Sequence, residues 1–175
     1  MIEIRVYATF VAGNIPLGIY WVLLGMFLIG LLVLIWWKGF WLGLSYCSTL
    51  LLSEWTFLIL CATIIFRETG AERGYNLIPF WSYFDYRQHS YFMEMFSENI
   101  LNVLLFVPVG FLAGCGLQGM TLKKMLFLGG GLSIFIELFQ FFLKKGFCEI
   151  DDVIHNLVGC LIGYGLCRLC CFAWR

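Results

Sequence analysis

Long runs of apolar residues, separated by short polar segments, make up most of this chain. They cover residues 15–37, 40–66, 99–117, 125–143 and 153 to about 172. Each run is close to the roughly 20 residues that an α-helix needs to cross the hydrocarbon core of a bilayer. The pattern predicts an all-α polytopic membrane protein, a transmembrane helical bundle of about five spans.

Two longer polar segments interrupt the runs, and we expect both on the same side of the membrane. Residues 67–98 carry charged side chains interleaved with aromatic ones, which is typical of a loop lying against the membrane interface. Residues 144–152 form a shorter polar loop. Because spans alternate in direction, these loops and the N-terminus share one side, while the turns at 38–39 and 118–124 and the C-terminus lie on the other.

This alternation gathers the polar residues expected within the membrane at the loop end of the bundle. Glu137 and Gln140 are i,i+3 neighbours, and Asp152 lies one turn before His155 and Asn156. A bare carboxylate in lipid is costly, so these side chains should face the bundle interior and find partners. The predicted polar cluster consists of Arg67, Arg73, Asn102, Glu137, Gln140, Asp151, Asp152, His155 and Asn156.

Two interpretations of this cluster stay open. It is either a buried polar network that locks helices together or a binding site for a charged headgroup or a cation. Carboxylates with an imidazole can bind a divalent cation, and the same carboxylates can form ion pairs with Arg67 and Arg73. No activated nucleophile is recognisable, so we assign no catalytic residue, and a binding role is favoured over an enzyme.

Composition agrees with a membrane protein and excludes one class of partner. Hydrophobic residues make up 62% of the 175 residues and charged residues 13%, with a formal net charge of zero. Without a basic surplus we expect no nucleic-acid partner. The run at 15–37 is too long for the apolar core of a cleaved signal peptide, so we expect it to stay as an anchor.

We expect most of the cysteine residues, and Glu54 near the centre of the second run, to have a packing or structural role. Most of the eight cysteines lie inside apolar runs, where cysteine behaves as a small hydrophobic residue. Cys167 and Cys170 have CxxC spacing, but no second pair or histidine cluster accompanies them. Glu54 lies near the middle of the second run, and we expect its neutral form to bond a neighbouring helix, a proton-coupled role being the alternative.

Three stretches together resemble the VanZ-like family of bacterial membrane proteins. They are Asn76-Leu-Ile-Pro-Phe-Trp-Ser-Tyr83, residues 99–111, and Glu137-Leu-Phe-Gln140 followed by residues 149–156. The resemblance covers about residues 50–167 and highlights much of the polar cluster. The chain departs from the family pattern at Phe147, where many relatives have arginine, and at Glu149, where many have aspartate. The resemblance also highlights a structural motif of Pro79, Phe80, Phe106, Pro108, Gly110 and Gly159.

The resemblance implies a domain organisation, a location and a function. Residues 1–45 would be an anchor span added to a VanZ-like membrane domain at 46–175, in a bacterial plasma membrane. The expected function is tolerance of glycopeptide antibiotics such as teicoplanin. An outward-facing polar site would bind an anionic lipid-linked or cell-wall-related ligand. A membrane enzyme acting on a lipid-linked substrate and a small transporter are the alternatives.

Overall fold

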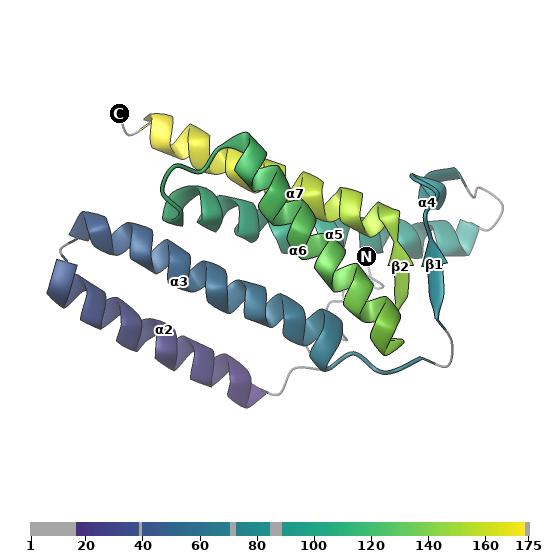
Figure 1. The fold of residues 1–175 in the computed structure, drawn as a ribbon, viewed down its shortest axis with the longest axis horizontal. Coiled ribbons are helices and arrows are strands. Elements are labelled where there is room, and N and C mark those ends of the chain that lie inside the picture. The colour runs from purple at the N-terminus through teal and green to yellow at the C-terminus, as the bar shows by residue number, and fades with distance from the viewer. Residues whose placement is uncertain (1–16, 39, 71–72, 85–88, 174–175) are drawn as a thin grey trace.

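Five long helices form the structure, a computed structural model that describes residues 17–38, 40–70, 73–84 and 89–173 (Figure 1). A short helix and two strands complete it. The elements are α2 (Leu17–Lys38), α3 (Phe40–Leu60) continued by a π-helix (Cys61–Ile65), β1 (Gly74–Asn76), α4 (Trp81–Phe84), α5 (His89–Gly116), α6 (Leu122–Leu143), β2 (Phe147–Glu149) and α7 (Ile150–Ala173). The predicted helical bundle is confirmed.

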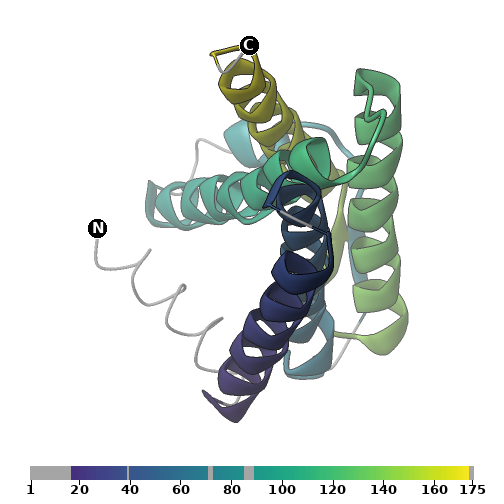
Figure 2. The same ribbon diagram turned by 90° about the vertical axis from the view of Figure 1, so that its left-hand side faces the viewer.

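Four of these helices are long and apolar enough to cross a membrane. The qualifying segments are Ser45–Ile65, Phe96–Gly116, Leu122–Leu143 and Ile150–Cys170. Helix α2 has 22 residues, but the apolar stretch found within its described part is the shorter Trp21–Gly30. It packs against α3, at the edge of the bundle (Figure 2).

Helix boundaries differ from the hydropathy pattern where polar residues begin a helix. Helix α5 starts at His89, ten residues before the predicted apolar run, and α7 starts at Ile150. Asp151 and Asp152 therefore lie in the first turn of α7 rather than in a loop. Carboxylates are stabilised there by the partial positive charge of a helix N-terminus.

The two predicted loops are joined by strand pairing. Strands β1 and β2 form a two-stranded parallel sheet in which Gly74 pairs with Phe147 and Asn76 with Glu149. The hydropathy pattern did not predict this sheet, because three residues are too short to show an alternating pattern. In Figure 1 the sheet and α4 lie at one end of the bundle, while the α5–α6 turn and the end of α7 lie at the other.

Helices α5 and α7 make the closest contact in the bundle. A Cβ added to Gly159 would lie 2.2 Å from the Val103 carbonyl oxygen, and one added to Gly163 would lie 1.9 Å from that of Val107. A Cβ on Gly110 would lie 1.9 Å from the Cys160 carbonyl oxygen. Glycine at these positions lets the two backbones touch, as in other membrane helix pairs.

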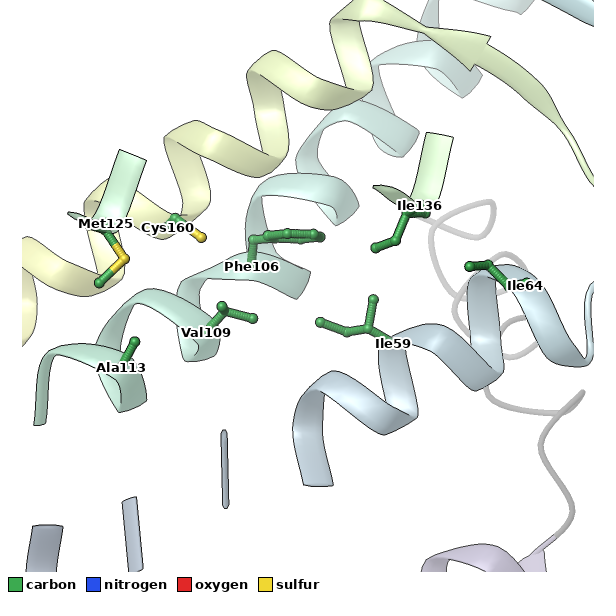
Figure 3. Packing of buried hydrophobic residues seen from close by; sticks show 8 residues of the cluster. All are labelled: Ile59, Ile64, Phe106, Val109, Ala113, Met125, Ile136 and Cys160. Carbon is green, nitrogen blue, oxygen red and sulfur yellow. The ribbon is translucent and has the colours of Figure 1, made fainter. Parts of the chain in front are cut away.

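The apolar core lies beside this contact. It takes side chains from the four helices that qualify as spans, and Phe106 of α5 is the largest fully buried side chain (Figure 3). Trp55 of α3 donates from its indole nitrogen to the Leu105 carbonyl oxygen over 2.9 Å. Helix α5 continues through Pro108, and α7 fills the space beside Gly110. The core residues are Ile59, Ile64, Phe106, Val109, Ala113, Met125, Ile136 and Cys160.

Candidate polar site at the loop end of the bundle

Glu137 is buried at the loop end of α6, with 3% of its surface exposed. It lies six residues before the end of the helix, or roughly 9 Å at the usual helical rise. Its Oε2 accepts a hydrogen bond of 3.0 Å from the backbone N–H of Glu149. The carboxylate therefore holds the last residue of β2 against α6, which confirms neither interpretation of the cluster by itself.

Asp152 joins α7 to α5. Its Oδ1 accepts a hydrogen bond of 2.7 Å from Nδ2 of Asn102, fifty residues earlier in the chain. The amide of Asn102 thus satisfies one oxygen of a carboxylate near the membrane interface. Sequence reasoning placed both residues in the cluster, and the structure brings them together as a direct pair.

Arg67 supplies positive charge to the carboxylates at this end. It lies close enough to Glu137, Glu149 and Asp152 for its charge to act on all three. Its guanidinium lies against Gly146, where an added Cβ would meet the guanidinium carbon at 3.0 Å. Gly146 also has φ of +152°, so glycine is needed there for space and for backbone conformation.

The glycine before Phe147 has an arginine side chain against it, although that arginine comes from a distant part of the chain. Sequence reasoning offered Lys144 or Lys145 as a substitute for the arginine that many relatives have after the glycine. In the structure, Arg67 is the cation that lies against Gly146, and Lys145 instead donates from Nζ to the Ile65 carbonyl oxygen over 2.9 Å.

The Glu149 carboxyl lies outside the spans and is half-buried. Burial raises its pKa above the ordinary value of a glutamate, the charge of Asp151 adds to the rise, and the charge of Arg67 opposes it. Burial likewise raises the pKa of the neighbouring Cys148 thiol, together with the charges of Glu137, Asp152 and Glu149. Burial is the larger cause of both shifts, and the neighbouring carboxylates add to it.

Asp151 and His155 hold the segment around α4. A carboxylate oxygen of Asp151 accepts from the backbone N–H of Phe80, which has a positive φ of 61°. Nδ1 of His155 pairs with the Asp151 carbonyl oxygen, and Nε2 pairs with the Tyr83 hydroxyl at 2.7 Å. These contacts position the loop. Sequence reasoning missed Tyr83 as a site residue, because its partner lies 72 residues away.

Gln140 and Asn156 tie helices to one another. Nε2 of Gln140 donates to the Thr63 carbonyl oxygen over 3.0 Å, which joins α6 to the π-helix. Nδ2 of Asn156 donates to Ser133 Oγ over 2.9 Å, which joins α7 to α6. Asn156 Oδ1 is buried and has no hydrogen-bond partner in the described part of the chain. For these two amides the contacts favour the structural interpretation.

Four cationic residues surround the end of α6 and form what we call the basic rim: Arg67, Arg73, Lys144 and Lys145. Arg73 and Lys144 are exposed. The Arg73 guanidinium lies 5.9 Å from the centre of the Phe141 ring and within 3.5 Å of the Phe142 carbonyl oxygen. Cations at a helix C-terminus are favoured by the partial negative charge of its free carbonyls.

Aromatic rings lie next to the basic rim. We call Tyr75, Phe141, Phe142 and Phe147 the aromatic platform. Tyr75 meets Phe141 edge-on at 6.4 Å between ring centres, and Phe142 meets Phe141 at 5.7 Å. Three of the four are mostly exposed: Tyr75 at 70%, Phe142 at 63% and Phe147 at 64%.

The acidic residues do not form an arrangement suited to a metal ion. Within the described ranges, no group of three or more histidine, cysteine, aspartate or glutamate side chains could hold one. Asp151 and His155 already form hydrogen bonds with the segment around α4, and Glu137 accepts one from the last residue of β2. A cation site is therefore not supported by the geometry of these side chains.

Comparisons with known proteins agree on one family. Residues 40–171 match the family model described as VanZ/LLP1. A stretch of 101 residues is 33% identical to Protein VanZ of Enterococcus faecium and covers 53% of this chain and 61% of that protein. The chain thus aligns with less than two thirds of this curated relative. No solved structure matches. All residues of the predicted cluster and motif lie within the matched range.

Proposed function

Because this chain belongs to the VanZ/LLP1 family, we propose that it contributes to tolerance of glycopeptide antibiotics such as teicoplanin in a bacterial plasma membrane. In this proposal it is a multi-pass binding protein with its loop end outward. Its ligand is an anionic molecule, either a lipid-linked precursor of the cell wall or another anionic lipid.

The basic rim is the observation that carries this proposal. Two of its members, Arg73 and Lys144, are exposed, so they can contact a ligand without first being uncovered. Arginine and lysine are the side chains that bind phosphate through charge-assisted hydrogen bonds. In this proposal Arg73 makes the outer contact, and Arg67 contributes from its half-buried position among the carboxylates.

The aromatic platform supports a lipid-linked ligand in particular. Its exposed rings lie beside Arg73, since Phe141 contacts Arg73, Tyr75 and Phe142. Aromatic side chains are favoured at the boundary between headgroups and hydrocarbon. A molecule with a phosphate and an apolar chain would meet a cation and an apolar surface side by side.

The test compares rim variants in binding and in cells. We expect Arg73→Gln combined with Lys144→Gln to weaken binding of phosphatidylglycerol roughly tenfold or more, because each charge-assisted contact contributes about 1.5–3 kcal/mol. Native mass spectrometry of the purified protein, with phosphatidylcholine as the neutral comparison, measures this. The same variant should lose teicoplanin tolerance in a host that depends on this protein.

The matched control is Lys123→Gln combined with Lys124→Gln, at the other end of α6. It removes the same amount of positive charge near the opposite end of α6 and should leave both readouts unchanged. Full binding and full tolerance in the rim variant would contradict the proposal. Turnover of a lipid-linked substrate by the unsubstituted protein would favour the enzyme alternative instead.

A further inference from the structure

Two cysteines on neighbouring helices face each other at the end of the bundle opposite the polar site. Sγ of Cys115, on α5, lies 3.0 Å from Sγ of Cys167, on α7. The two residues are 52 positions apart in the chain. The CxxC spacing suggests that Cys167 would pair with Cys170 on the same helix. In the structure, Cys167 instead lies beside Cys115 of α5.

The helix contact fixes the distance between the two sulfurs. Helices α5 and α7 touch through Gly159 and Gly163, and the contact continues to Gly114, next to Cys115. A Cβ added to Gly114 would lie 3.1 Å from the Cβ of Cys167 and 2.9 Å from its Sγ. The backbones are therefore already close, and the sulfurs need to approach by only about 1 Å to reach the length of a disulfide bond.

We infer that Cys115 and Cys167 form an oxidation site at which the two thiols are joined in a disulfide linking α5 to α7. The reaction needs an oxidant of the disulfide class, such as oxidised glutathione. Cys115 is the entry point, since it is half-buried and Cys167 is fully buried.

The chemistry balances in two exchange steps. The Cys115 thiol loses its proton, and its sulfur attacks one sulfur of the oxidant, forming a mixed disulfide and releasing one glutathione thiolate. The Cys167 thiol then loses its proton, and its sulfur attacks the Cys115 sulfur and displaces the second glutathione. The protein gives up two electrons and two protons, and the oxidant becomes two thiols.

This modification is independent of the proposed ligand. It would fix two helices that also carry Asn102 and Asp152, whose side chains pair at the other end. A covalent link between α5 and α7 restricts the unfolded chain and should therefore raise the resistance of the protein to thermal unfolding.

The experiment uses the purified full-length protein in detergent. After treatment with oxidised glutathione and removal of excess reagent, intact mass spectrometry should show the loss of two hydrogen atoms. Peptide mapping without reduction should find one cross-linked species joining the peptides that contain Cys115 and Cys167. A reducing agent should restore the original mass.

Three variants make the result specific. Cys115→Ser and Cys167→Ser should each prevent the mass loss. Cys160→Ser, which changes another buried cysteine of α7, should leave it intact. The peptide map of the unsubstituted protein does not depend on how well the variants fold. An unchanged mass, or a link that joins either residue to any other cysteine or to a second chain, would overturn the inference.

Discussion

At the scale of single residues, the ionisation of Glu149 makes the stability of the fold depend on pH. Its pKa is raised by burial and by Asp151, so the folded protein binds this proton more tightly than the unfolded chain does. The charged carboxylate therefore destabilises the fold above its folded-state pKa. That cost disappears as the pH falls below the ordinary pKa of glutamate.

Glu149→Gln removes this titration. We expect the variant to be more stable than the unsubstituted protein at neutral pH, by less than about 1 kcal/mol because the carboxyl is half-exposed and screened by water. At about pH 4 the two proteins should unfold at the same temperature. Thermal unfolding across this pH range measures the difference, and a stability gap that grows on acidification would contradict the assignment.

Glu54 presents a different case, a carboxyl near the centre of a span. Among the residues that the structure describes, it has neither a hydrogen-bond nor an ion-pair partner, so the expected bond to a neighbouring helix is not found. An unsatisfied polar group away from water costs about 1–3 kcal/mol. Glu54→Leu should therefore raise the unfolding temperature in detergent, and a lowered one would show that the side chain has a stabilising partner.

At the scale of elements, the α5–α7 contact depends on glycine at defined positions. Gly163 touches the Val107 carbonyl oxygen, whereas Gly165, two residues on, has nothing within 4 Å of an added Cβ. Gly163→Ala should destabilise the protein by about 1–3 kcal/mol, because the backbones must separate to admit the methyl group.

Gly165→Ala is the matched control on the same helix. It should be neutral or stabilising by up to about 1 kcal/mol, since alanine favours a helix and space is available. Thermal unfolding of both variants, with helix content followed by circular dichroism, measures the difference. Equal effects of the two substitutions would mean that the contact at Gly163 is not close.

A helix or strand could be predicted from the sequence where the residues that determine it lie close together in the chain. The runs of apolar residues predicted α3, α5, α6 and α7, because hydrophobicity over about 20 residues is sufficient to define a span. The β1–β2 pair was not predictable in this way. Each strand has three residues, and the reason for pairing lies some 70 positions away in the chain.

At the scale of the whole molecule, the alternation of spans predicted a group of polar residues at one end, and several hydrogen bonds of the structure lie within that group. The alternation could not identify the pairs within that group. Arg67 lies against Gly146, and Tyr83 bonds His155, because loops from different parts of the chain meet there. The division into an anchor at 1–45 and a domain at 46–175 stays a prediction.

The pairing of α5 with α7 also sets an order for biosynthesis. Helix α5 leaves the ribosome well before α7, with the whole of α6 made between them. Asn102 is therefore synthesised before its partner Asp152, and Glu137 is synthesised before Glu149, which supplies its backbone donor. A nascent chain that stops before residue 149 lacks the partners of both of these polar groups. Synthesis of β2 and of the first turn of α7 therefore completes both pairs.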